Sequence, residues 1–359
     1  MRTKIPRAIF MFLVLGGISI FLHQATTAET GSFTFAAAGD HGTGAMAAVV
    51  LDQIPRSGAS FFLSLGDLIY SSTYGESKWC QFVKSRLGPR GATFPFQIIA
   101  GAHEDGVNHH DGLIDHIVAD GCLPNRLPIV QSPHVGTNPS STGNYAKEYY
   151  FDVPASSPLA RFILISPALH FKYGGRYDYT EGGPRYRWVA STIAEARAKG
   201  IPWVIVVMHR NCISMGVKQC ETGTDIFNLL VSTKVDLILQ GHDHNYQRSK
   251  QFTLTSSCPA ISPRSFNANC VVDPHVTDTY AKGAGPVLII NGLGGRGTNT
   301  LNRTDPEAPY FVTAQNSSYG IVKFVVSQTT IDGSFVKATG SYTDAFSISA
   351  SGTDRVGMR

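Results

Sequence analysis

The segment LILQGHDHNY, residues 237–246, ends an apolar run at a glycine and then places two histidines one residue apart. We expect residues 237–240 to form a buried strand, because the run is short, apolar and stopped by Gly241. His242 and His244 then lie at the carboxyl end of that strand, where α/β sheets keep their ligand sites. Side chains at i and i+2 of an extended segment point the same way, so both imidazoles can reach one metal ion. Taken alone, the pair could also be two surface histidines on a loop.

Four other apolar runs end in a similar way. The runs, each with the motif that follows it, are FTFAAA-GDHG (residues 33–42), FFLSL-GDLIY (61–70), FQIIA-GAHED (96–105) and WVIVVM-H (203–209). A glycine after a strand lets the backbone turn sharply and approach an ion closely. A single aspartate there could be a helix N-cap or a turn residue. Five strand ends that all carry carboxylate or imidazole groups are better explained by one metal site.

Together these five blocks resemble the signature of the calcineurin-like metallophosphoesterases, and the GDLIY form resembles the purple acid phosphatase branch. The likeness continues in residues 247–248 (QR), 291–297 (NGLGGRG) and 318–324 (SYGIVKF). It therefore covers nearly the whole chain after residue 28. The resemblance implies an α/β fold: a metallophosphoesterase-type sandwich of two mixed β-sheets flanked by helices, with the metal site at the carboxyl ends of the strands.

The resemblance also implies a centre of two metal ions. The first ion would be held by Asp40, Tyr70 and His244, the second by His209 and His242, and both by a bridging Asp67. Most of the wider family has histidine where this chain has Gly42, and Tyr70 supplies the missing ligand, as in purple acid phosphatases. A phenolate favours a hard ferric ion, so we expect iron first and zinc, iron or manganese second. His41 is expected to support the site without binding a metal.

The implied reaction is hydrolysis of phosphomonoesters by attack of a metal-bound hydroxide. Two close cations lower the pKa of a shared water and offset the charge that develops on the phosphoryl group. His103 is the predicted catalytic residue, protonating the leaving alkoxide or binding a phosphoryl oxygen. His109 and His110 could face the substrate, or lie in a solvated loop.

Ala102 departs from the family pattern, which has asparagine there as an oxygen ligand of the second metal. Water could fill the gap, Glu104 or Asp105 could take the position, or the enzyme could be impaired. Two alternatives to a phosphomonoesterase stay open. One is a phosphodiesterase or nucleotide-cleaving enzyme of the same fold, which uses the same metals with a wider cleft. The other, indicated only by Ala102, is a catalytically impaired metal- or phosphate-binding protein.

The N-terminus has the pattern of a secretory signal peptide. Three basic residues precede the apolar run 8–22, and small residues at 25–28 offer a cleavage site. We predict a signal peptide over 1–28, a metallophosphoesterase catalytic domain over 29–350 and a frayed tail over 351–359. An uncleaved anchor is the alternative. The predicted location is secreted or periplasmic, with no stable membrane span after cleavage.

Charge and composition limit the partners. An apolar fraction of 43% and a charged fraction of 16% are typical of a globular protein. The net charge of +4 includes the three basic residues of the signal segment, so the remaining chain is nearly neutral. This balance gives no reason to expect nucleic acid as a partner. The family resemblance implies a phosphorylated small-molecule substrate.

Six cysteines in an exported chain indicate disulfides rather than free thiols. Fifteen pairings are possible, and short loops favour Cys212–Cys220 and Cys258–Cys270, which leaves Cys80–Cys122. Residues 302–304 and 316–318 fit the glycosylation acceptor pattern, which matters only in a eukaryotic host.

The remaining pattern indicates one domain without repeats. We expect helices over 44–53, 185–199 and 225–232, and long loops over 130–144 and 258–282 that overhang the site. The end of the chain is rich in strands, which we place at 287–290, 320–326, 330–336 and 344–348.

Overall fold

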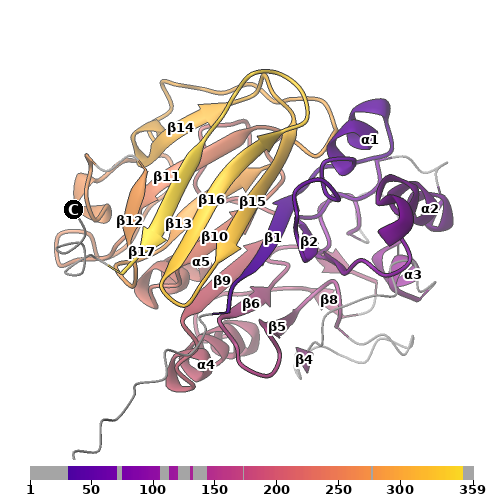
Figure 1. The fold of residues 1–359 in the computed structure, drawn as a ribbon. Helices are drawn as coiled ribbons and strands as arrows, with labels where there is room; N and C mark the ends of the chain where they lie inside the picture. Colours follow the sequence, from indigo (N-terminus) through magenta and orange to yellow (C-terminus); the bar gives the residue numbers. More distant parts are fainter. Residues whose placement is uncertain are drawn as a thin grey trace, which may run out of the picture. The chain divides into compact units, whose positions relative to one another are not determined.

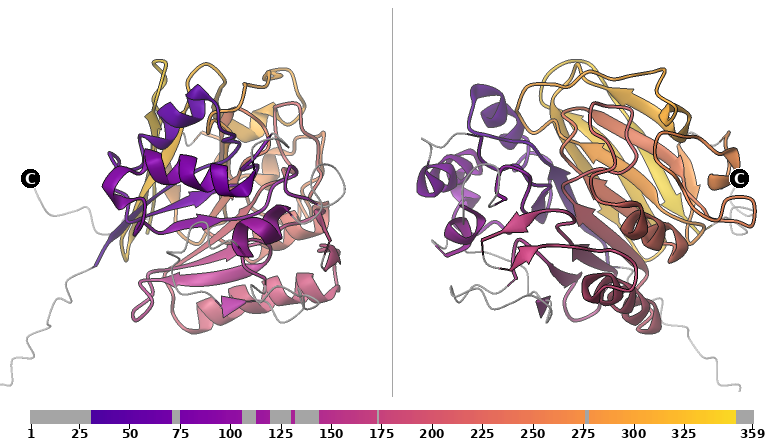
Figure 2. Two further views of the ribbon diagram at one scale, coloured as in Figure 1. Left: turned by 90° about the vertical axis from the view of Figure 1, so that its right-hand side faces the viewer. Right: turned by 180° about the vertical axis from the view of Figure 1, so that it is seen from behind.

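Two mixed β-sheets form the framework of the computed structural model, which describes residues 31–70, 75–105, 113–119, 130–131, 144–172, 174–275 and 278–350. The predicted signal peptide over 1–28, the tail over 351–359, His109, His110 and Cys122 lie outside these residues. Figure 2 shows the two sheets as adjacent layers. The predicted sandwich of two mixed sheets is therefore confirmed.

The first sheet combines the start of the described chain with its end (Figure 1). Its strands, in spatial order, are β12 (Thr279–Ala281), β17 (Ala345–Ser349), β16 (Thr330–Lys337), β15 (Gly320–Val326), β1 (Phe33–Ala38), β2 (Phe61–Ser64) and β3 (Phe96–Ile98). β1, β2 and β3 are parallel, and their last residues pair in register. The segments that follow these three strands therefore all leave the sheet at the same end, the carboxyl end of the strands.

The second sheet has a parallel centre and antiparallel edges. In spatial order its strands are β14 (Phe311–Gln315), β11 (Tyr246–Gln251), β13 (Val287–Asn291), β10 (Leu237–Gln240), β9 (Trp203–Met208), β6 (Ala160–Leu164), β5 (Tyr149–Val153) and β4 (Val130–Gln131). β6, β9, β10 and β13 are parallel and buried along their whole length. Burial on both faces explains why their sequences are continuous apolar runs.

Helices cover the sheets. They are α1 (Ala45–Leu51), α2 (Glu76–Arg86), α3 (Leu113–Ala119), α4 (Pro184–Ala198) and α5 (Thr224–Ser232). α1 and α2 lie beside the β1–β3 end of the first sheet, and α4 and α5 lie on the outer side of the second (Figures 1 and 2). α4 begins with a proline in its first turn and buries the apolar face that its spacing predicts. The sequence analysis did not predict α2 or α3.

Shorter elements complete the described chain. A two-stranded hairpin joins β7 (His170–Phe171) to β8 (Gly175–Arg176), and 3₁₀ turns cover Gly88–Arg90, Ala268–Cys270 and Ala308–Tyr310. The two predicted loops are not wholly irregular. The first begins with β4, which pairs with β5, and the second contains a 3₁₀ turn and β12, which pairs with β17.

Aromatic side chains join the two sheets. Phe35, Phe61 and Phe324 extend from the first sheet, and Phe151 and Phe162 from the second, all almost fully buried. The ring of Phe162 meets those of Phe35 and Phe61 edge-on, with centroids 5.0 and 5.5 Å apart. Burying one such ring stabilises the fold by roughly 1.5–3 kcal/mol. This contact fixes the two sheets face to face, a few residues before the strand ends.

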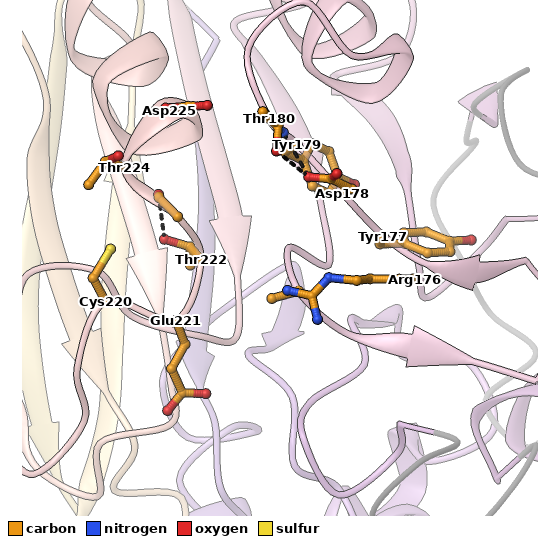
Figure 3. A pocket seen from close by; sticks show the side chains of 12 residues that line it. Arg176, Tyr177, Asp178, Tyr179, Thr180, Cys220, Glu221, Thr222, Thr224 and Asp225 are labelled. Atoms are coloured by element: carbon orange, nitrogen blue, oxygen red, sulfur yellow. Dashed lines mark hydrogen bonds between the residues drawn. The ribbon is translucent and has the colours of Figure 1, made fainter.

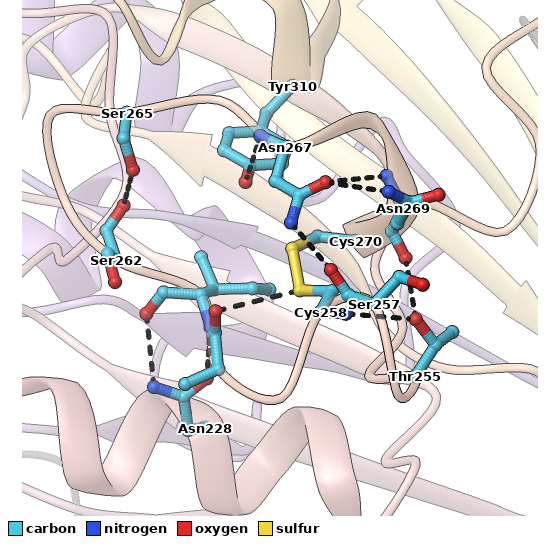
Figure 4. Close-up of a disulfide and its surroundings, with 12 residues drawn as sticks. Asn228, Thr255, Ser257, Cys258, Ser262, Ser265, Asn267, Asn269, Cys270 and Tyr310 are labelled. Carbon is cyan, nitrogen blue, oxygen red and sulfur yellow. Dashed lines mark hydrogen bonds between the residues drawn. A yellow bond between two sulfur atoms is a disulfide. The ribbon is translucent and has the colours of Figure 1, made fainter.

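Two of the predicted disulfides lie within the described residues. Cys212 is bonded to Cys220, and Cys258 to Cys270. Figure 4 shows the second bond among the polar contacts of its loop, where Asn267 binds Ser257 and Asn269. Cys80 is also disulfide-bonded, and its predicted partner lies outside the described residues. No helix in the described part of the chain is long and apolar enough to cross a bilayer.

Gly66, which follows β2, allows a close approach between the two sheets. Its φ of +91° is unfavourable for a side chain, and a Cβ there would lie 2.7 Å from Nδ1 of His209 and 2.9 Å from Cα of Gly101. Gly58 also has a positive φ, of +75°, but nothing lies within 4 Å of its Cβ position. A side chain at Gly66 would therefore meet both backbone strain and steric overlap, whereas one at Gly58 would meet backbone strain alone.

We expect Gly66→Ala to destabilise the protein by about 2–5 kcal/mol, through strain and overlap together. The matched variant Gly58→Ala, which meets strain alone, should cost about 1–2 kcal/mol. Chemical unfolding of both variants beside the natural protein measures the difference. Equal losses would show that the turn after β2 moves aside without cost.

Candidate metal centre

The strand ends of both sheets meet at one place. Asp40 and Asp67 follow β1 and β2, and His209 and His242 follow β9 and β10. The backbone N–H of His242 donates to Oδ2 of Asp40 at 2.8 Å, which joins the sheets directly. Asp40, Asp67 and His242 have φ values of 63°, 52° and 73°. Such left-handed conformations are unfavourable outside glycine and are concentrated at functional sites.

The first cluster of candidate ligands consists of Asp40, Asp67 and His244, whose ligand atoms lie within 4.8 Å of one another. The hydroxyl of Tyr70 lies among them. It is 2.9 Å from Oδ1 of Asp40, 3.1 Å from Oδ2 of Asp67 and 3.2 Å from Nε2 of His244. Four of the residues singled out from sequence therefore surround one point.

The second cluster consists of Asp67, His209 and His242, again with ligand atoms within 4.8 Å of one another. Nε2 of His209 lies 3.2 Å from Oδ1 of Asp67, but it makes no hydrogen bond with any described residue although it is fully buried. A buried ring nitrogen without a hydrogen bond is uncommon, and a cation between it and the carboxylate would satisfy both. The donor set thus fits a pair of ions that share Asp67.

Outer contacts orient each imidazole. Nδ1 of His209 lies 2.8 Å from the Leu65 carbonyl oxygen, and Nδ1 of His244 lies 2.6 Å from that of Gly297. These nitrogens donate, which leaves Nε2 of each ring as the acceptor facing its cluster. His242 differs, because its Nε2 lies 2.9 Å from Oε1 of Glu221.

The electrostatics of the site favour bound cations. Burial opposes ionisation of Asp67, but the charge of His209 outweighs it and holds the pKa of Asp67 well below its usual range. Burial likewise lowers the pKa of His209, and the Asp67 carboxylate raises it more, to about 9. Burial together with Asp40 and Asp67 raises the pKa of Tyr70 well above its usual value. A phenolate at Tyr70 thus needs a compensating cation.

Two further histidines were singled out from sequence. His41 is buried, with Nε2 3.0 Å from the Ala38 carbonyl oxygen, and it belongs to neither cluster. Burial lowers its pKa, so it remains a neutral supporting residue. His103 donates its backbone N–H to Oδ1 of Asp67 at 2.8 Å, and its ring lies 4.2 Å from that of Tyr70. About a quarter of its side chain is exposed, so it faces the open side of the centre.

The carboxylates next to Ala102 lie outside both clusters. Glu104 is buried and accepts backbone N–H groups of Leu68, Ile69 and Gly101 at 2.8, 3.1 and 2.9 Å. Burial first, and then the Asp67 charge, raises its pKa to about 8. Asp105 is buried with Oδ2 3.6 Å from Arg210. In this arrangement neither carboxylate takes the place of the missing asparagine.

Sequence reasoning missed several neighbours of the site. Glu221 contacts His242, and Arg210 contacts Glu221 with Nε 3.3 Å from Oε2. Glu221 also lines a pocket of about 260 Å³ between residues 176–180 and 220–225 (Figure 3). Arg296 lies over the Tyr70 ring, with its guanidinium carbon 4.7 Å from the centroid. Glu221 and Arg210 belong to no sequence motif, although Arg210 directly follows a predicted ligand. Arg296 lies in the glycine-rich stretch 291–297, but sequence reasoning assigned it no role.

Comparison with known proteins agrees with this geometry. The family model for calcineurin-like phosphoesterases matches residues 33–246, so the chain belongs to that family. It is 25% identical over 221 residues to probable purple acid phosphatase 20 of Arabidopsis thaliana, covering 60% of this chain and 46% of that protein. It is 26% identical over 299 residues to probable inactive purple acid phosphatase 24 of the same plant, covering 79% and 42%. The chain thus spans about half the length of the curated relatives that it matches.

Among solved structures, the purple acid phosphatase from yellow lupin (Lupinus luteus) seeds shares the fold. It aligns with a TM-score of 0.66 at 18% identity, over 90% of this chain and 54% of that one. The family, its purple acid phosphatase branch and the fold class predicted from sequence are therefore confirmed, and the family implies a dinuclear metal site.

Proposed function

We propose that this protein is an exported, metal-dependent phosphatase that hydrolyses phosphomonoesters. The observation that carries the proposal is the shared carboxylate of Asp67, which belongs to both ligand clusters at the carboxyl ends of the strands. A pair of ions that share one carboxylate supplies an activated water and neutralises phosphoryl charge in hydrolases of phosphate esters. Export is supported by the two disulfides and by the pattern of residues 1–28.

In this proposal each ion has its own ligands. Asp40, Tyr70 and His244 hold the first ion, His209 and His242 hold the second, and Asp67 bridges them. Tyr70 favours iron in the first position, because a phenolate is a hard anionic donor. The two imidazoles are compatible with zinc, iron or manganese in the second.

His103 would act on the substrate rather than on the ions. Its backbone is fixed by Asp67 and its ring lies against Tyr70, so the imidazole stays next to the centre. Its partial exposure lets it reach a leaving-group oxygen, to which it donates a proton. The Arg296 guanidinium above Tyr70 adds positive charge where a phosphate would approach.

A second candidate function rests on Ala102. The second cluster contains three protein ligands among the described residues, and neither Glu104 nor Asp105 belongs to it. A protein that holds the first ion firmly and the second poorly could bind phosphate without turning it over. A metal- or phosphate-binding protein is therefore the second candidate, and turnover measured together with metal content distinguishes it from the enzyme.

Turnover of p-nitrophenyl phosphate and of its bis-ester, measured with the metal content per chain, tests the proposed function. We expect the monoester to be the better substrate. Asp67→Asn, which weakens both clusters, should lower the rate by roughly 10²-fold or more. Preference for the bis-ester would indicate a phosphodiesterase. Two bound ions with no turnover of either ester would favour the binding protein.

If Tyr70 binds ferric iron, the purified protein will show a broad charge-transfer band in the visible spectrum. Tyr70→Phe should abolish that band, because it removes the phenolate oxygen and keeps the ring. Tyr150→Phe, at a half-buried tyrosine on β5, is the matched control and should keep the band. A colourless, iron-free and fully active protein would overturn the tyrosinate–iron assignment and leave the phosphatase proposal intact.

Ala102→Asn should restore an oxygen ligand and tighten binding of the second ion. Ala102→Leu provides the bulk of asparagine without its oxygen, so it should not. Losing even an indirect partner of a metal costs roughly 10- to 100-fold in affinity, so a shift at least that large is expected for a direct ligand. Metal content after stepwise dialysis measures it. Equal retention by the natural protein and Ala102→Asn would show that another group completes the second site.

A further inference from the structure

We propose that Glu221 is a positioning residue that holds the ring of His242 with Nδ1 directed at the second ion. The inference deepens the proposed function and rests on its two-ion centre. It follows from the contact between Oε1 of Glu221 and Nε2 of His242, which are 2.9 Å apart. No motif of the family signature in this sequence contains Glu221.

The contact determines which nitrogen can bind a metal. A carboxylate has no proton to donate, so the shared proton belongs to Nε2 of His242. The neutral ring then carries its lone pair on Nδ1, and a metal ion binds that lone pair. The ring of His242 lies 4.7 Å from that of His209, the other histidine of the second cluster. Nδ1 of His242 and Nε2 of His209 thus serve the same ion.

His242 is the exception among the three candidate ligand histidines. His209 and His244 donate Nδ1 to backbone carbonyl groups, so their orientation is a property of the fold. His242 depends on a side chain, and it has a left-handed backbone with φ of 73°. Carboxylate partners of this kind fix the tautomer of a metal-binding histidine and raise its basicity. Substitution of Glu221 therefore removes the partner that orients the His242 ring and changes none of the candidate metal ligands.

The surroundings of Glu221 hold it in place. Its backbone N–H donates to the Asn211 carbonyl oxygen at 2.9 Å, and its Oε2 lies 3.3 Å from Nε of Arg210. The Asn211 amide in turn donates to the carbonyl oxygen of Gly241, at 3.0 Å. Glu221 is thus linked to the residue just before its histidine partner. Figure 3 shows its carboxylate at one end of the neighbouring pocket.

The number of ligands makes this orientation important. With Ala102 in place of asparagine, the second cluster offers Asp67, His209 and His242 from the described residues. If the ring of His242 exchanged its tautomer, Nδ1 would carry the proton and one of three ligands would be lost. The first ion does not depend on His242, because its cluster is formed by other side chains.

Zinc titration of the full-length metal-free protein, with metal per chain counted after dialysis, tests the inference. We expect Glu221→Ala to weaken binding of the second ion by roughly 10- to 100-fold and to leave the first unchanged. Glu221→Gln, whose amide oxygen still accepts from Nε2–H, should fall between Glu221→Ala and the natural protein. Glu181→Gln is the matched control, because it makes the same chemical change at an exposed glutamate. It should bind both ions normally.

The ¹⁵N chemical shifts of the His242 ring provide a second readout, because they would not change if Glu221 only stabilised the fold. They should report Nε2–H in the natural protein and a mixture of tautomers in Glu221→Ala. If Glu221→Ala does not fold, Glu221→Gln is the test. A natural protein that binds two ions, with a Glu221→Ala variant that binds them equally well, would overturn this inference alone. A natural protein that never binds a second ion would overturn the two-ion proposal itself.

Discussion

The carboxylate of Asp40 joins the two sheets at the point where their strands end. One oxygen accepts the backbone N–H of His242 from the second sheet, and the other lies 2.9 Å from Tyr70 and 3.2 Å from His244. One side chain thus fixes the position of a loop and contributes to a ligand cluster. Asp40 also has a left-handed backbone, which costs about 1–3 kcal/mol and persists because the surrounding fold holds it.

Burial explains why the site needs cations. Asp40 and Asp67 are almost fully buried, and two close carboxylates in such a place repel each other unless positive charge compensates them. The protonated histidines can provide some of that charge, as the raised pKa of His209 shows. Bound metal ions would supply more positive charge and would displace the protons. The aromatic contact between the sheets, centred on Phe162, keeps the strand ends close together, and both candidate ligand clusters combine side chains from the two sheets.

The sequence predicts those strands and helices well whose limits depend on residues within the same segment. β1, β9 and β15 have the predicted bounds, because each is an apolar run with a clear stop. α2 was missed because its buried side chains, Trp79, Cys80 and Val83, are too few to give a helical period among polar neighbours. Cys212–Cys220 could be expected from their short separation.

The site divides in the same way. Each candidate ligand directly follows or lies near a strand end, so an apolar run and a motif were enough to find it. Glu221 and Arg210 could not be found in this way, because their roles depend on how separate loops pack against each other. Glu104 was weighed as a replacement ligand. Its three backbone contacts, which depend on the turn after β2, show it instead as a support of the loop.

Those contacts also limit what the alanine at position 102 can change. Glu104 fixes the turn after β2 and the glycine before Ala102, and Asp67 fixes the backbone of His103 just after it. These contacts support the loop without a metal–asparagine bond, so we expect the alanine to affect only the affinity for the second ion. A fold that depended on the metal to shape this loop would have lost the position of His103 as well. Support of the loop by Glu104 and Asp67 thus explains how the other candidate ligands keep their positions although asparagine is absent.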